Sequence, residues 1–142
     1  MSDGVMLREA YPVTSGDFTT AGEASAKIKR ILKKLGVDSS VVRRVSVAAY
    51  EVELNLVIHS DGGEMELIVR PDYLELNVRD VGPGIPDIDL AMREGYSTAS
   101  DDVRTMGFGA GMGLPNMKRN ADDFSISSSV GVGTEILMGF KL

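Results

Sequence analysis

The chain has no cysteine among its 142 residues and only one histidine, His59. Without thiols it can form neither a disulfide bond nor a thiolate metal site, and one histidine argues against a zinc centre. A reducing compartment is compatible with this composition.

A basic excess and long apolar runs are also absent. The 15 Lys and Arg are outnumbered by 21 Asp and Glu, which gives a net charge of -6. A surface of this sign does not favour a phosphate backbone, so we expect no nucleic-acid partner. No apolar stretch reaches the ~18 residues of a membrane span, and the first residues lack a signal-peptide pattern. We therefore expect a cytoplasmic protein without a membrane partner.

Several common site motifs are missing as well. The sequence contains no G-x-x-x-x-G-K-[ST] and no G-x-S-x-G. A G-x-G-x-G pattern occurs within 107–113, but no strand directly precedes it. These absences argue against Walker and Rossmann sites and against a hydrolytic triad.

Glycines are plentiful and are concentrated in two places. Gly107, Gly109, Gly111 and Gly113 alternate with larger residues, a pattern that suits a loop whose backbone approaches a ligand. The helix expected over Leu114–Asn120 follows directly, and a glycine loop before a helix N-terminus favours anions. The second glycine turn, 80–84, follows an alternating strand. Together the two turns predict a pocket for nucleotide phosphates.

The hydrophobic periodicity predicts one domain over 1–142, in the order β-α-α-β-β-α-α-β-β. This order favours an α/β class, or an α+β two-layer sandwich, in which helices cover one face of a mixed, mainly antiparallel sheet. The expected strands are Val5–Tyr11 (closed by Pro12), Met65–Arg70, Tyr73–Asp80, Phe124–Ser129 and Glu135–Lys141. The expected helices begin at a capping box (Thr20–Glu23) and at Asp38–Ser40, and further helices cover Ile88–Glu94 and Leu114–Asn120. We expect a mobile polar loop over Ser97–Met106.

Three polar residues recur at i, i+4 and i+8 on the second expected helix: Glu51, Asn55 and His59. An amide oxygen is a suitable single ligand for Mg²⁺, and a carboxylate one turn away could accept a proton from an attacking hydroxyl. Alternatively, Glu51 and Glu53 are solvated surface acids and His59 caps or packs the helix.

Asp80 and Thr134 each have two interpretations. A buried Asp80 carboxylate could accept the exocyclic amine of adenine, or the residue could form an Asx-type turn. Thr134 follows Gly133 and could simply belong to a hairpin.

Taken together, these motifs resemble the GHKL (Bergerat-fold) ATP-binding superfamily. The run from Glu51 to His59 resembles its N box, 80–86 its G1 box, 109–114 its G2 box and Gly133-Thr134 its terminal element. Within the superfamily the chain is most similar to bacterial anti-sigma-factor serine kinases, in particular the RsbT-like stressosome switch kinases. The runs 80–88, 95–98, 113–119 and 133–136 carry this second resemblance.

The resemblance implies ATP and Mg²⁺ as cofactors, Glu51 as the general base, Asn55 as the magnesium ligand and Asp80 as the adenine-binding residue. The loop 99–106 is longer than switch kinases usually carry, and it includes Arg104, a candidate phosphate contact. The full nucleotide-binding set implied in this way is Asn55, His59, Asp80, Gly82, Gly84, Ile85, Arg104, Gly107, Gly109, Ala110, Gly111, Met112, Gly113, Leu114 and Thr134.

The resemblance also implies a function. The leading hypothesis is a serine/threonine kinase that phosphorylates a STAS-domain partner, and the alternative is an ATP-dependent module that sequesters a sigma factor or phosphatase activator. A third hypothesis is the detached catalytic domain of a histidine kinase, although the chain contains no phosphoacceptor helix pair. A gyrase-like or chaperone-like ATPase would need a further domain. A homodimer or a large partner complex is plausible, with Val5–Tyr11 as a pairing edge.

Overall fold

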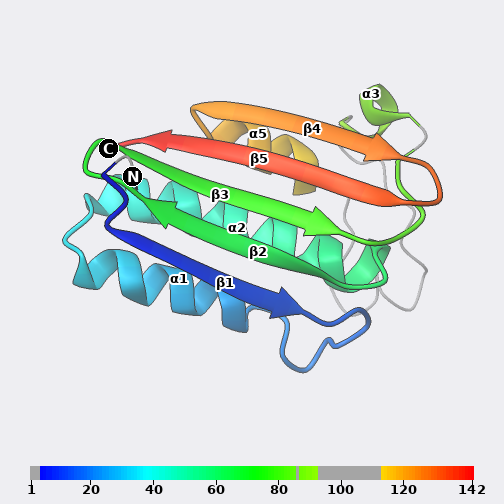
Figure 1. Cartoon of the computed structure of the whole chain (residues 1–142), viewed down its shortest axis with the longest axis horizontal. Helices are drawn as coiled ribbons and strands as arrows, with labels where there is room; N and C mark the ends of the chain where they lie inside the picture. The colour runs from blue at the N-terminus through cyan, green and yellow to red at the C-terminus, as the bar shows by residue number, and fades with distance from the viewer. Residues whose placement is uncertain (1–3, 86, 93–112) are drawn as a thin grey trace.

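The computed structural model describes residues 4–85, 87–92 and 113–142. Five strands in these ranges form one sheet in the order β1-β2-β3-β5-β4 (Figure 1). The strands are β1 (Leu7–Val13), β2 (Gly63–Val69), β3 (Tyr73–Asp80), β4 (Asp123–Ser129) and β5 (Gly133–Lys141). All four pairings between them are antiparallel, which is simpler than the mixed, mainly antiparallel sheet that we expected.

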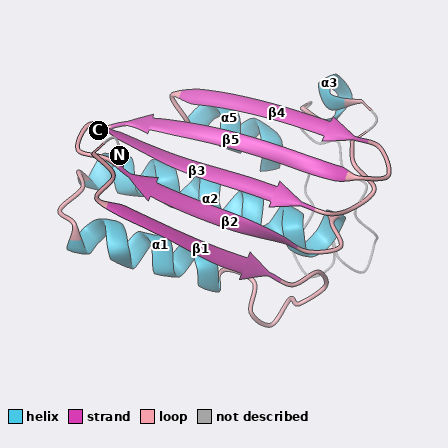
Figure 2. Cartoon of the chain, viewed as in Figure 1, coloured by secondary structure: helices cyan, strands magenta, loops and turns pink. Residues whose placement is uncertain are grey.

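The long helices lie together on one face of this sheet (Figure 2). They are α1 (Glu23–Lys34), α2 (Ser39–His59) and α5 (Gly113–Asn120), and a single turn, α3 (Ile88–Ala91), precedes α5 in the chain. The predicted two-layer α/β arrangement is therefore confirmed. None of the helices in the described ranges has the length and apolar character needed to cross a membrane.

The central helix α2 supplies the apolar stripe that the sequence predicted. Its inward side chains are at most 3% exposed and pack against the inward residues of the sheet. Burial of each such Val or Leu stabilises the fold by ~1.5–3 kcal/mol. The stripe comprises Val42, Val45, Ala49, Val52 and Leu56. Because this side is fixed against the sheet, the polar residues of α2 face its flanks.

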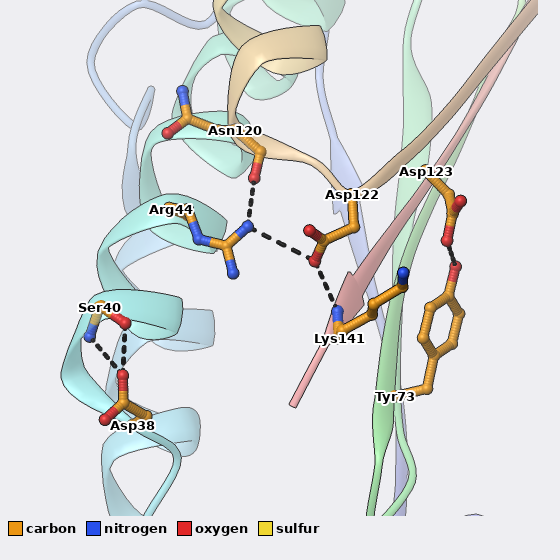
Figure 3. Close-up of polar contacts among 8 residues, drawn as sticks. All are labelled: Asp38, Ser40, Arg44, Tyr73, Asn120, Asp122, Asp123 and Lys141. Carbon is orange, nitrogen blue, oxygen red and sulfur yellow. Dashed lines mark hydrogen bonds and ion pairs between the residues drawn. The ribbon is translucent and has the colours of Figure 1, made fainter.

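Two helix boundaries follow the sequence prediction. Gly36 lies just after α1 with φ +75°, a conformation that glycine adopts without steric cost. Asp38 caps α2, since its carboxylate accepts hydrogen bonds from the backbone N–H of Ser40 (3.1 Å) and from the Ser40 hydroxyl (Figure 3).

The predicted capping box at the start of α1 is wrong. Gly22 occupies the N-cap position with φ +100°, and no local side chain caps the helix. Instead, the Glu53 carboxylate of α2 accepts the backbone N–H groups of Gly22, Ala24 and Ser25 at 3.0, 3.2 and 2.9 Å. Glu53 is only 3% exposed, so its interpretation as a solvated acid is also wrong. Local spacing could not reveal a cap that lies about 30 residues away.

Other boundaries differ by a few residues. β1 runs to Val13 and includes Pro12, which is tolerated because β1 is an edge strand. The short helix predicted to reach Glu94 ends earlier, with Met92 as its C-cap. The closing hairpin turns over 130–132, since β5 already begins at Gly133.

Polar contacts join α2, the end of α5 and the last strand (Figure 3). The Arg44 guanidinium donates to the Asn120 carbonyl (3.1 Å) and lies 3.5 Å from an Asp122 carboxylate oxygen. The same Asp122 oxygen accepts the backbone N–H of Lys141 at 2.7 Å. These bonds fix α5 beside α2, which matters because α5 begins at the candidate site.

A second contact spans three strands. The Tyr73 hydroxyl of β3 donates to the Asp123 carboxylate of β4 at 2.6 Å, crossing β5 at Gly139 (Figure 3). A Cβ on Gly139 would lie 1.6 Å from the Tyr73 oxygen, so glycine leaves the path open. The hydrogen bond to Asp123 is the main reason that the pKa of Tyr73 is raised to about 12.

Candidate functional site

The start of α5 meets the polar stripe of α2. A Cβ on Gly113 would lie 3.4 Å from the Asn55 amide oxygen and 3.4 Å from a Glu51 carboxylate oxygen. Both of these side chains are half-buried. The carboxylate and the amide, one turn apart on α2, therefore converge beside a helix N-terminus, where backbone N–H groups favour negative charge.

Asn116 also belongs to this cluster, and the sequence analysis missed it. Its side-chain Nδ2 donates to Glu51 Oε1 at 3.3 Å, and its side-chain Oδ1 accepts from the Arg119 guanidinium at 3.0 Å. Asn116 follows Gly113 by three residues, so both lie on one side of α5. That i, i+3 spacing was the available signal. The contact orients the Glu51 carboxylate.

His59, the third member of the stripe, lies in the last turn of α2. Burial lowers its pKa below the usual 6.5, which favours the neutral imidazole at neutral pH. The glycine turn after β3 packs against this end of the helix, because a Cβ on Gly82 would lie 3.2 Å from the Ser60 Cα.

Asp80 lies at the end of β3, and its Oδ1 accepts the backbone N–H of Thr134 at 2.8 Å. Burial is the main cause that raises the pKa of Asp80; the Thr134 hydrogen bond opposes the shift and the nearby Asp61 charge adds to it. The bond to Thr134 spans 54 residues, which differs from the local contact of an Asx turn. It engages one of the two carboxylate oxygens, Oδ1.

Two glycines allow close backbone packing around Asp80. Gly84 has φ +76°, and a Cβ there would lie 2.5 Å from the Ser129 carbonyl oxygen. A Cβ on Gly133 would lie 2.2 Å from the Asp80 carbonyl oxygen. A larger residue at either position would displace backbone, so the turn after β3 and the β4–β5 hairpin form one tightly packed unit.

A pair of hydroxyls supports the same unit. Ser128 Oγ and Thr134 Oγ1 are 2.8 Å apart, and Ser128 Oγ accepts the backbone N–H of Ile85 at 2.7 Å. Sequence reasoning named Ile85 and Thr134 but missed Ser128, because nothing in a serine-rich strand distinguishes this serine from its neighbours.

The two parts of the site lie at the same end of the molecule. Asp80 pairs with Gly63 in the sheet, and a Cβ on Gly63 would lie 2.8 Å from a methyl group of Leu56. Leu56 follows Asn55 directly on α2. Asp80 is therefore next to the C-terminal half of the helix that carries Asn55 and Glu51.

Several predicted residues lie outside the described ranges. These are Arg104, Gly107, Gly109, Ala110, Gly111 and Met112, together with the loop predicted over Ser97–Met106. Leu114 is described, and its side chain is 8% exposed and packs in the core.

Comparison with known proteins assigns the family. Residues 21–142 match the family of histidine kinase-, DNA gyrase B- and HSP90-like ATPases. The chain belongs to this family. The GHKL resemblance seen in its motifs is thereby confirmed, and with it the ATP-binding type of fold.

Curated relatives place the chain within one part of this family. The chain is 34% identical over 112 residues to the serine/threonine-protein kinase RsbT of Bacillus subtilis (strain 168), covering 76% of this chain and 78% of that protein. It is 31% identical over 102 residues to an anti-sigma F factor of Clostridium acetobutylicum, covering 68% of each. The predicted kinship with anti-sigma regulatory kinases is confirmed, and the chain is an ATP-using enzyme of the kinase type.

A solved structure supports the fold alone. The SiaB–SiaC complex from Pseudomonas aeruginosa contains a chain that matches with a TM-score of 0.62 at 11% identity, covering 97% of this chain and 90% of that one.

Proposed function

We propose that this chain transfers the γ-phosphoryl group of Mg²⁺-ATP to a serine or threonine of a STAS-domain partner in a partner-switching pathway. The observation that carries the proposal is the convergence of Glu51 and Asn55 at the N-terminus of α5. Phosphoryl transfer depends mainly on positioning and charge neutralisation, and this arrangement offers both.

Asn55 would supply one oxygen ligand to the metal. Among the described residues, no group of three or more His, Cys, Asp or Glu could hold a metal ion. A protein site with one amide oxygen suits Mg²⁺, which takes its other ligands from phosphates and water. The ion, when bound, would neutralise charge on the transferred phosphoryl group.

Asp80, in the tightly packed turn after β3, would bind the adenine end of ATP. Thr134 fixes the carboxyl group, and close packing at Gly84 and Gly133 leaves the turn no room for larger side chains. In this role the ionised Asp80 carboxylate accepts a hydrogen bond from the exocyclic amine of adenine. The N-terminus of α5, near Gly113, would face the phosphates.

Glu51 would act as the general base. Its carboxylate takes the proton from the acceptor hydroxyl as the new O–P bond forms and the bond from the γ-phosphorus to its bridging oxygen breaks, releasing ADP. Asn116 would hold the carboxylate in the required orientation.

The partner class rests on the relatives. One is a serine/threonine-protein kinase and another is an anti-sigma F factor, so their names combine phosphorylation with binding to a regulator. A phosphate added to a STAS domain would break a close interface by repulsion and desolvation. The anti-sigma relatives also favour a second candidate, an ATP-dependent module that sequesters a sigma factor or activator with little phosphotransfer.

Transfer of labelled phosphate from ATP to the candidate STAS partner tests the proposal. We expect Glu51→Gln to reduce transfer by roughly 100-fold or more while ATP still binds, because the variant keeps the shape of the side chain and loses the base. Glu64→Gln, an exposed site on β2, is the matched control and should transfer like wild type.

Three outcomes distinguish the alternatives. Transfer by Glu51→Gln at the wild-type rate would disprove the base assignment. Nucleotide-dependent partner binding without transfer would favour the sequestering module. A label that acid removes would indicate phosphohistidine and a histidine-kinase activity.

A further inference from the structure

A groove of about 690 Å³ runs along the outer side of α1 and α2. α1 and α2 lie next to each other on the helical face (Figure 1). The groove begins at Val37, in the turn that joins them. Its apolar lining includes Val37, Val47 and Tyr50. Val47 and Tyr50 are 37% and 41% exposed, so α2 presents apolar side chains to solvent on this side.

Cations surround this apolar lining. Lys29 and Lys33, one turn apart on α1, line one side, and Arg43 of α2 lines the other. None of the three takes part in an ion pair within the described part of the chain. A cationic groove contrasts with a net charge of -6, and it complements an acidic segment with apolar side chains.

Glu51 belongs both to this groove and to the candidate site. It lines the groove beside Tyr50, and its carboxylate also contacts Asn116 and lies close to Gly113. A chain lying in the groove would therefore lead directly to the group that accepts the proton.

We propose that this groove docks an acidic, apolar-faced segment of the substrate protein and brings its acceptor hydroxyl to Glu51. The inference rests on the proposed kinase function and adds to it a docking surface and a substrate chemistry. The apolar floor binds side chains of the segment, and the three cations hold its carboxylates.

The helix geometry sets the expected spacing. Arg43 and Glu51 are eight residues apart on α2, which corresponds to about 12 Å along the helix axis. An extended chain advances ~3.3 Å per residue, so this distance matches roughly four residues. The inference therefore predicts an acidic residue about four positions from the phosphorylated serine or threonine.

A set of short synthetic peptides tests this spacing. Each peptide carries one central serine and one fixed Asp or Lys at a varied distance, and phosphate incorporation from Mg²⁺-ATP is measured together with ATP turnover. With wild type, we expect Asp near the fourth position to raise incorporation at least several-fold over Lys. The double variant Lys33→Glu/Arg43→Glu should abolish or reverse that preference, because it removes Arg43, the cation from which the spacing is derived.

Arg30→Glu/Lys34→Glu is the matched control. It makes the same change of charge at exposed positions of α1 that do not line the groove, and it should keep the wild-type preference. Equal ATP affinity and equal urea midpoints for the two double variants confirm that both are folded.

The outcomes separate the two proposals. ATP turnover without any peptide phosphorylation, without an acidic preference, or with the same preference in both double variants overturns the docking inference and leaves the proposed kinase function intact. No ATP turnover under any condition overturns the proposed function, and the docking inference with it.

Discussion

Glu51 and Glu53 lie two residues apart on α2 and have different surroundings. At 100° per residue their side chains leave the helix about 200° apart, so they face opposite neighbours. Glu51 is half-buried and contacts Asn116 of α5, whereas Glu53 is 3% exposed and binds three backbone N–H groups at the start of α1. Glu53 therefore has a structural role in capping α1, whereas Glu51 is the proposed general base.

His59 gives a prediction about pH at the residue scale. Burial lowers its folded pKa below 6.5, so as the pH falls the unfolded chain binds a proton before the folded chain does. The resulting stability is present above about pH 6.5 and is lost as the pH falls through the folded pKa, by ~1.4 kcal/mol per unit of pKa difference. Urea unfolding of wild type and His59→Asn, at pH values above and below 6.5, measures this loss as the difference between the two proteins.

The chain offers a direct control for this prediction. Because His59 is the only histidine, its NMR titration reports one group without assignment. A measured pKa at or above 6.5 would contradict the prediction, as would an equal pH dependence in wild type and His59→Asn.

At the scale of the elements, α1 depends on α2 for its N-terminal cap. The first N–H groups of a helix have no partner within the helix, and the left-handed Gly22 provides no side chain to bind them. The buried Glu53 carboxylate satisfies three donors at once, so the start of α1 is fixed to α2.

The cap that Glu53 provides to α1 predicts the effect of Glu53→Gln. The neutral amide keeps the volume but loses charge-assisted hydrogen bonds, which contribute ~1.5–3 kcal/mol each. We expect the free energy of unfolding to fall by about 2 kcal/mol in urea titrations, since the amide oxygen retains part of the bonding.

Glu51→Gln is the paired variant for this measurement. It should lower phosphotransfer with little effect on the urea midpoint, whereas Glu53→Gln should lower the midpoint. If both variants changed stability equally, the assignment of the buried cap to Glu53 alone would be wrong.

For the whole molecule, the nucleotide would join parts of the chain that are distant in sequence. Glu51 and Asn55 come from α2, Asp80 from the end of β3, and Thr134 from β5. A ligand that contacts all of them binds only the folded state, so it stabilises that state by mass action.

Mg²⁺-ATP should therefore raise the thermal midpoint. At a free concentration roughly 100 times Kd the expected gain is ~2.7 kcal/mol, which scanning calorimetry can detect. We expect Asn55→Ala to lose the part of the gain that depends on Mg²⁺, because its amide is the proposed ligand.

Asn77→Ala provides the matched control. Asn77 lies within β3, where it alternates with the buried Leu76 and Val78 and so faces away from the helices. This variant should respond to Mg²⁺ like wild type. An equal response to ATP with and without chelator in wild type would rule out the metal site.

Local pattern predicted much of this molecule because its signals are short in range. The apolar stripe of α2, the Asp38 cap and the glycine that ends α1 depend on neighbours within a few residues, as does the alternation of β2 and β3. The i, i+4 spacing of Glu51 and Asn55 also fixes their common side of the helix in advance.

Only the tertiary structure decided which distant groups meet. It brought Glu53 to the start of α1, Asn116 to Glu51, and the Thr134 amide to Asp80 across 54 residues. The sequence by itself determined the elements and their polar and apolar faces, since dihedral preferences and periodicity are local. Strand order and helix docking set the remaining contacts, because they depend on how the whole core packs.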